Sequence, residues 1–138
     1  MTDLSNLIEK LQAATGPDRE LDCEIAVALD GYFEVPPRFG RVAVDYACTR
    51  GGETMLPGQG GDQLVPHYTA SLDAVVELAE RLFGHAATLD ITINIGAAYH
   101  SCAFFPFELD EPFVAENART PAIAACIAIL KAKEFLDE

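Results

Sequence analysis

The spacing of apolar residues predicts a pair of amphipathic helices near the start of the chain. In residues 3–14, leucine and isoleucine recur every three to four positions, and charged or polar residues fill the opposite side. That spacing is typical of a helix with one buried face. Gly16 and Pro17 then break the chain, and Pro17 can open a second helix that ends at Gly31, with acidic residues in its first turn. The short link between the two stripes predicts a helical hairpin.

Two further helices are predicted later in the chain. Ser71 can cap a helix whose apolar stripe ends at Gly84. The last helix is expected to begin with Thr120 as its cap and Pro121 at its first helical position. Residues 122–130 are apolar on every side, which predicts burial on more than one face.

Alternating apolar and polar residues predict the strands. Residues 41–49 and residues 89–95 both alternate, and the second run is the clearest strand signal in the chain. Residues 96–98 suit a tight turn into a further strand over residues 99–107, and strands joined in this way are antiparallel. We expect residues 89–95 to form the central strand. Residues 51–63 hold five glycines and a proline, so we expect a long loop there.

These elements follow the order ααβ–αββα, with three or four strands. Each predicted strand buries one face, and the helices must cover that face. The predicted fold class is therefore α+β, a layered sandwich in which helices cover a three- to four-stranded, mainly antiparallel sheet. A length of 138 residues suits one domain, so we expect residues 1–138 to form a single unit.

Composition and charge exclude several classes of function. The chain has 9 Lys and Arg residues against 22 Asp and Glu residues, which gives a net charge of −13 and a pI near 4.4. This charge disfavours direct binding to nucleic acid or to an anionic membrane surface. The longest apolar run, residues 121–130, has about half of the roughly 20 residues that a membrane-spanning helix needs. The first ten residues do not resemble a signal peptide, so we expect a cytoplasmic location, with the four cysteines reduced and buried.

Three segments of the chain resemble a known family. They are AATGPDRELDCEIA (residues 13–26), YTASLDAVVEL (residues 68–78) and ARTPAIAACIAILKA (residues 118–132), and they occur in this order. The combination is similar to the small phage and prophage proteins of the phage ABA-sandwich domain family. The resemblance implies a layered fold and a phage origin, with a bacterial host cell as the setting, but no reaction. Relatives commonly carry tryptophans in or before the predicted hairpin, and this chain has none, so no ligand role of those aromatic residues is transferred.

A histidine and a cysteine on one predicted strand are the nearest approach to a catalytic or metal motif. His100 and Cys102 lie two residues apart, so they share a face. With Cys48 or His67 brought near by folding, they could hold zinc or form a nucleophile–base pair. Neither arrangement has a local sequence signature, and ordinary packing in a sheet explains both residues.

Other catalytic patterns are also missing from the sequence. Asp45 and Asp90 on neighbouring strands could form a carboxylate pair, but both suit an exposed strand face. The glycine-rich residues 51–63 lack the Lys-Ser/Thr of a phosphate-binding loop, and no G-x-G-x-x-G occurs. We therefore predict a protein that is not an enzyme and needs no metal or cofactor.

The scarce cations mark a candidate binding site. Arg38, Arg41 and Arg50 lie within thirteen residues, flank the predicted strand and adjoin the glycine-rich segment. Arginine makes bidentate contacts to phosphate and carboxylate, and aromatic rings stack on bases. Arg119 directly precedes the Thr120 cap, where a helix N-terminus favours an anion. An alternative is that these arginines pair with surface carboxylates or with a neighbouring subunit. The residues expected to contact the ligand are Arg38, Arg41, Tyr46, Arg50, His67, Tyr68, Tyr99, His100 and Arg119.

Four phenylalanines close together predict self-association. Phe104, Phe105, Phe107 and Phe113 surround two prolines, and alternation along a strand cannot bury all four in one small core. Part of this cluster is expected at a subunit interface, so we expect a homo-oligomer.

The predicted function is binding of a small anionic molecule without chemistry. The resemblance supplies a phage setting, in which a small protein that sequesters a nucleotide-type immune signal of the host, such as a cyclic or ADP-ribose-type nucleotide, needs no catalytic residues. One alternative is an acidic inhibitor or nucleic-acid mimic directed at a host protein. Others are a minor structural protein of the phage particle, or an enzyme acting through His100, Cys102 or a carboxylate.

Overall fold

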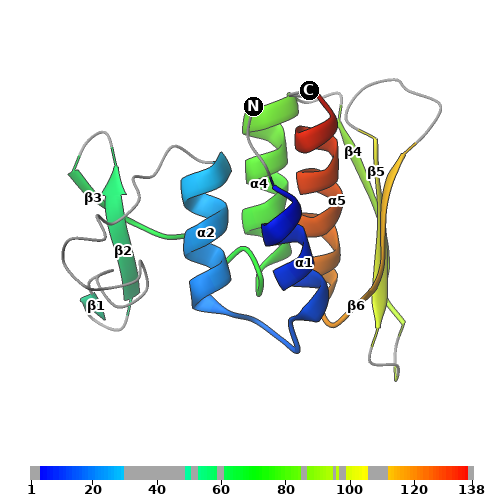
Figure 1. Cartoon of the computed structure of the whole chain (residues 1–138), viewed down its shortest axis with the longest axis horizontal. Helices are drawn as coiled ribbons and strands as arrows, with labels where there is room; N and C mark the ends of the chain where they lie inside the picture. The colour runs from blue at the N-terminus through cyan, green and yellow to red at the C-terminus, as the bar shows by residue number, and fades with distance from the viewer. Residues whose placement is uncertain are drawn as a thin grey trace.

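The structure confirms an α+β fold in which helices cover an antiparallel sheet (Figure 1). The computed structural model describes residues 4–29, 49–50, 53–58, 61–84, 87–94, 96, 99–105 and 112–136. Its helices are α1 (Ser5–Ala13), α2 (Arg19–Leu29), α4 (Leu72–Phe83) and α5 (Pro121–Leu136). Its strands are β1 (Thr49–Arg50), β2 (Glu53–Gly58), β3 (Gly61–Leu64), β4 (Thr88–Thr92), β5 (His100–Phe105) and β6 (Phe113–Ala118).

The main sheet contains β4, β5 and β6 in that order, and both neighbouring pairs are antiparallel. β5 is therefore the central strand. The prediction that residues 89–95 form the central strand is wrong, because β4 ends at Thr92 and lies at an edge of the sheet. Strong alternation reports one buried face, and an edge strand has this feature as well as a central one.

β6 is a strand that the hydrophobic pattern does not reveal. The alternation is interrupted at Asn117, whose φ of 59° lies in the left-handed region. The pairing of β5 with β6 shifts register between His100 and Cys102. A bulge places an extra residue in one strand, so the period of two is lost where it occurs.

α5 lies at the centre of the hydrophobic core. It packs against β5 and β6 on one side and against α1 and α4 on the other (Figure 1). Ten of its 16 residues are buried, among them Ile123, Ile127 and Leu130. The predicted burial of this helix on more than one face is thus confirmed.

The predicted caps of α4 and α5 are also confirmed. The Ser71 hydroxyl accepts a hydrogen bond from the amide of Ala74 at 3.3 Å, and α4 ends at Gly84 with a φ of 82°, which favours glycine. The Thr120 hydroxyl accepts a hydrogen bond from the amide of Ile123 at 3.0 Å. Each hydroxyl satisfies an amide that the first turn of a helix leaves without a partner.

The start of α2 differs from the prediction by two residues, because the helix begins at Arg19 rather than at Pro17, and Asp18 is its cap. The Asp18 carboxylate accepts hydrogen bonds from the amides of Glu20 at 2.8 Å and Leu21 at 3.3 Å. A carboxylate at this position satisfies free amides and also complements the helix dipole. α1 and α2 pack on each other, as expected for a helical hairpin.

A second, smaller antiparallel sheet contains β1, β2 and β3. The prediction of a loop over residues 51–63 is wrong, because β2 and β3 pair from Met55↔Leu64 to Gly58↔Gly61. A hairpin is defined by its backbone hydrogen bonds. Gly58 and Gly61, which pair beside the turn, carry no side chain, so the pattern of alternating side chains does not reveal this hairpin. Of the strand predicted over residues 41–49, only Thr49 lies among the described residues.

The phenylalanines divide between the core and the surface. Phe104 is fully buried and contacts Phe83 edge to face, with 5.0 Å between the ring centroids. Phe113 is half-buried and packs on the exposed Phe135 at 5.5 Å. Phe105 is half-buried, and Phe107 lies outside the described residues. Self-association through this cluster stays a prediction.

A helix that crosses a bilayer needs about 20 predominantly apolar residues. None of the described helices combines the necessary length with a sufficiently apolar sequence.

Candidate functional site

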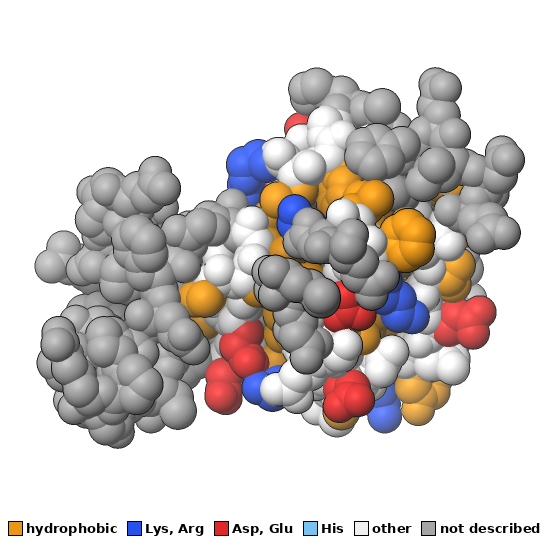
Figure 2. All heavy atoms as spheres, turned by 45° about the horizontal axis from the view of Figure 1, so that its top comes forward, with side chains coloured by type: hydrophobic (Ala, Val, Ile, Leu, Met, Phe, Trp, Pro, Cys, Tyr) orange, Lys and Arg blue, Asp and Glu red, His pale blue; other side chains and the backbone are white. Residues whose placement is uncertain are grey.

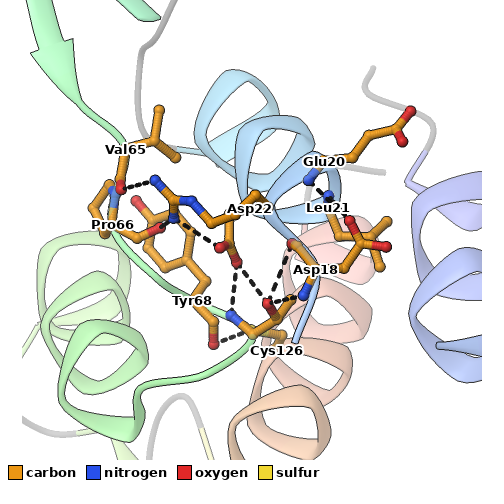
Figure 3. Close-up of polar contacts among 10 residues, drawn as sticks. Asp18, Glu20, Leu21, Asp22, Val65, Pro66, Tyr68 and Cys126 are labelled. Atoms are coloured by element: carbon orange, nitrogen blue, oxygen red, sulfur yellow. Dashed lines mark hydrogen bonds and ion pairs between the residues drawn. The ribbon is translucent and has the colours of Figure 1, made fainter. Parts of the chain in front are cut away.

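A buried polar cluster joins α2 to the segment that leads from β3 to α4 (Figure 3). The Asp22 carboxylate, 1% exposed, accepts a hydrogen bond from each of two groups of Thr69, the amide and the hydroxyl, both at 2.8 Å. Its other oxygen accepts from the Arg19 guanidinium at 2.8 Å. The same guanidinium donates to the carbonyl oxygens of Val65 at 2.9 Å and Pro66 at 3.2 Å. Arg19 is thus held in place by a carboxylate and two backbone carbonyls.

Thr69 extends this cluster to α5. Its hydroxyl accepts a hydrogen bond from the amide of Asp18 at 2.8 Å, and its carbonyl accepts one from the Thr120 hydroxyl at 3.1 Å. The Cys126 thiol donates to the neighbouring carbonyl of Tyr68 at 3.5 Å. Among the described residues, every buried polar side-chain atom has a hydrogen-bond partner. The cluster is therefore complete without a ligand, and its role is to fix α2, the segment of residues 65–69 and α5 to one another.

Hydrophobic spacing does not reveal this cluster, because Asp22 replaces an apolar residue on a buried face of α2. The only sequence signal is an Arg and an Asp three residues apart, which on a helix are neighbours. That spacing is common on exposed helix faces, so it does not distinguish a buried pair.

Several residues predicted at the ligand site lie elsewhere or cannot be placed. Tyr68 is fully buried, so its ring is not available for stacking on a ligand from solvent, and that prediction is wrong. The ring is apolar enough to be drawn into the core beside α5. His67 is exposed. Arg38, Arg41 and Tyr46 lie outside the described residues, as does the side chain of Arg50, whose backbone belongs to β1.

Three of the predicted residues do come together at one end of the main sheet. The Arg119 guanidinium lies over the Tyr99 ring, 4.9 Å from its centroid. His100 begins β5 directly after Tyr99 and pairs with Ala118, the residue before Arg119. Tyr99 and Arg119 are exposed and His100 is half-buried. We call these three residues the Tyr99–Arg119 cluster.

Asn94 holds the hairpin side of the Tyr99–Arg119 cluster. Its backbone amide donates a hydrogen bond to His100 Nδ1 at 3.2 Å, and its side-chain amide donates to the Tyr99 carbonyl at 2.9 Å. With Nδ1 as an acceptor, the proton of the neutral imidazole is assigned to Nε2. The histidine therefore offers an N–H donor on its far side.

The electrostatic setting of the Tyr99–Arg119 cluster favours an anion. Arg119 precedes Thr120, the cap of the 16-residue helix α5, so its charge lies beside the positive end of a helix dipole. A guanidinium stacked on a ring keeps its N–H donors free at its edge, where they can bind phosphate or carboxylate.

The predicted site is divided between two parts of the molecule. Figure 1 shows the sheet of β1–β3 beyond α2, on the opposite side of the helices from the sheet of β4–β6. Arg50 belongs to the first sheet and the Tyr99–Arg119 cluster to the second. Arg50 therefore does not share a site with that cluster.

The cysteines are poor candidates for nucleophiles. Burial raises the pKa of the Cys23 thiol to about 11 and that of Cys102 to about 12, and it also raises the pKa of Cys126. A thiol must ionise to act as a nucleophile or a metal ligand, so these three are inert at neutral pH. The part of the chain that the structure describes holds no group of three or more possible metal ligands.

The described surface includes two hollows that bear on ligand binding. The first, about 450 Å³, lies between α1 and α2, and its charged residues are Asp18, Glu20 and Glu24 with Lys10. Lys10 is bound to Glu24 at 2.7 Å, so the remaining charge is negative and disfavours an anionic ligand. The second, about 300 Å³, lies between α4 and β4 and has a mostly apolar lining.

Comparison with known proteins does not extend this picture. No protein-family model, no curated protein and no solved structure matches the chain. The resemblance to the phage ABA-sandwich family therefore stays a prediction.

Proposed function

We propose that this protein binds a small anionic molecule that carries a flat ring, of the nucleotide type, at the Tyr99–Arg119 cluster, and that it does so without chemistry. The observation that carries the proposal is the Arg119 guanidinium stacked on Tyr99 beside the start of α5. The guanidinium suits the phosphate, the tyrosine ring suits a base, and the Nε2–H of His100 supplies a further donor.

The proposal is limited to binding because His100 is the one described member of the Tyr99–Arg119 cluster that could act as an acid or base, and its Nδ1 is occupied by the backbone amide of Asn94. Cys102, the cysteine nearest in sequence to His100, is buried on the face of β5 that packs against α5. In a phage setting, such binding would remove a host immune signal from solution. Sequestration of this kind leaves the bound molecule intact.

Thermal unfolding with a panel of cyclic nucleotides and ADP-ribose derivatives tests the proposal. A molecule at a hundred times its dissociation constant stabilises the folded protein by about 2.7 kcal/mol. Arg119→Ala is expected to abolish the shift, and Arg119→Lys to reduce it because the bidentate geometry is lost. Arg81→Ala removes an equal charge from the exposed face of α4 and serves as the control. If no panel member raises the melting temperature, or if the bound molecule is recovered chemically changed, the proposal fails.

The acidic hollow between α1 and α2 favours a second candidate function, binding to a basic host protein. Its three carboxylates outnumber the single lysine, so it suits a lysine or arginine side chain of a partner. Figure 2 shows acidic and basic side chains interspersed on the face in view, which does not resemble the continuous charge of a nucleic-acid mimic. Titration with an arginine-rich peptide tests this function. Binding lost on Glu20→Lys but kept on Arg119→Ala would favour it over anion binding.

A further inference from the structure

The two edge strands of the main sheet, β6 and β4, differ in how accessible they are to a further strand. At the β6 edge, the Lys131 ammonium of α5 donates a hydrogen bond to the carbonyl oxygen of Val114 at 2.9 Å. A lysine at a strand edge opposes the approach of another strand. β4 forms the other edge, and among the described residues it pairs only with β5. In the part of the chain that the structure describes, the β4 edge is thus the one open to a further strand.

Backbone amides at the β4 edge face away from β5 at the positions that an added strand would need, Ile91 and Ile93. The amide of Asn94 turns toward β5, because it donates to His100 Nδ1. Successive amides of an extended chain turn to alternate edges, so those of Ile91 and Ile93 face away from β5. An added antiparallel strand would find its hydrogen-bonding groups there.

A protruding apolar side chain and an apolar hollow lie close together on this edge. Ile93, directly after β4, is 53% exposed. By the alternation of the strand it is on the same side as Leu89 and Ile91, the side that the helices cover. Leu89 lines the hollow of about 300 Å³ together with Val76, Ala79, Glu80, Gly84, Ala87, Thr88 and Phe104.

From this arrangement we propose that two copies of the chain pair through β4, antiparallel, with Ile91 opposite Ile91 of the second copy. In that register Leu89 lies opposite Ile93 of the second copy. The exposed Ile93 of each copy then enters the hollow beside Leu89 of the other. The two three-stranded sheets become one continuous antiparallel sheet, with the helices of both copies on the same face.

Charge and packing favour this register over those centred on Asp90 and on Leu89. With Ile91 at the centre, Asp90 faces Thr92 of the second copy, and no like charges are opposed. Centring on Asp90 would place two carboxylates directly opposite each other, which is destabilising. Centring on Leu89 would carry Ile93 four positions beyond Leu89 of the second copy and away from the hollow.

The occupant is a second copy because the protruding group and the hollow belong to the same strand edge. A two-fold interface requires each surface to be complementary to itself. Ile93 and Leu89 lie four residues apart, and antiparallel pairing brings both complementary contacts into register at once. The pairing does not depend on the proposed anion binding.

Sedimentation of the full chain over a range of concentrations gives the first test. We expect the protein to be a dimer, Ile93→Glu to be a monomer, and Val114→Glu to remain a dimer. Val114 is 40% exposed on β6, so it is a matched control for placing a charge at an exposed apolar position. Thermal melts confirm that both variants are folded, which is expected because neither side chain is buried.

Cross-linking gives the second test, because it reads the register directly. A mixture of Asp90→Cys and Thr92→Cys proteins is expected to form an intermolecular disulfide, since opposed residues of a non-hydrogen-bonded pair have Cα atoms about 4.5 Å apart. Each variant alone should form no more than the unchanged protein, whose own cysteines set the background.

Three outcomes would overturn the β4 pairing: a monomeric wild-type protein at all concentrations, an Ile93→Glu variant that dimerises as well as Val114→Glu, or no cross-link above background in the mixture. A monomer that instead captures a peptide at β4 would also overturn it, in favour of strand addition by another protein. Arg119→Ala should leave the dimer unchanged, so failure of the anion-binding proposal is distinguishable.

Discussion

The contribution of a single polar residue to the stability of this protein depends on whether its side chain is buried and hydrogen-bonded. Asp22 is the clearest example, since a nearly inaccessible carboxylate satisfies Thr69 and Arg19 together. Hydrogen bonds to a charged group are stronger than neutral ones, and a partner left alone in the interior is costly. Arg119 has the opposite character, because its exposed guanidinium rests on a ring and can accept a new partner.

Asp22→Ala is expected to lower the free energy of unfolding by about 3 kcal/mol, because the amide of Thr69 and the Arg19 guanidinium lose their acceptor. Chemical denaturation measures the change. Glu77→Ala, on the exposed side of α4, should stay within about 0.5 kcal/mol of the unchanged protein. A loss for Asp22→Ala as small as that of Glu77→Ala would show that the cluster does not stabilise the fold.

Alkaline pH should destabilise the protein through its buried thiols. Burial raises the pKa of Cys23 from 9.0 to about 11 and that of Cys102 from 9.0 to about 12, so the folded chain keeps protons that the unfolded chain releases. The stabilisation is complete below pH 9 and is lost as the pH rises through 11 to 12. Denaturation at pH 8 and pH 10.5 measures this fall, and Cys23→Ala should reduce it. An equal fall in that variant would exclude Cys23 as a source.

At the scale of elements, helix ends connect local sequence to tertiary structure. Ser71 and Thr120 both cap a helix in the way their sequence predicts. Thr120 also donates to the carbonyl of Thr69, so it links α5 to the segment that holds Asp22. Capping is a local property of the chain, whereas the hydrogen bond between Thr120 and Thr69 exists only because the segment of residues 65–69 is brought against the start of α5.

Thr120→Ala is expected to cost about 1.5 kcal/mol of folding free energy, more than Ser71→Ala, because it removes a tertiary hydrogen bond as well as a cap. Thr120→Ser keeps both hydrogen bonds and should restore most of the loss. Thermal or chemical unfolding of the three variants measures the order. Equal losses for Thr120→Ala and Ser71→Ala would mean that the bond to Thr69 contributes nothing.

At the scale of the whole molecule, the net charge of −13 affects both the proposed dimer and the proposed anion binding. Two copies that carry the same sign repel each other, and salt screens that repulsion. An anion bound to an arginine is held by attraction, and salt screens that attraction as well. The two proposed interactions should therefore respond to salt in opposite directions.

Raising NaCl from 50 to 500 mM is expected to strengthen the β4 dimer and weaken anion binding at the Tyr99–Arg119 cluster. Sedimentation equilibrium measures the first, and a thermal shift with a nucleotide of the panel measures the second. The same dependence in both measurements, in either direction, would contradict one of the two proposals.

The sequence by itself determined the helices, the caps of α4 and α5, the β4–β5 hairpin and the α+β class, because these follow from periodicity and from chemistry within a few residues. It did not reveal β6, where a bulge removes the period, or the hairpin of β2 and β3, where glycine conceals it. Only the tertiary structure decided that β5 is central, that Tyr68 is buried, and that Arg119 lies on Tyr99 while Arg50 belongs to another sheet. These features depend on contacts between segments far apart in the chain, and the local pattern of apolar residues does not encode which segments meet.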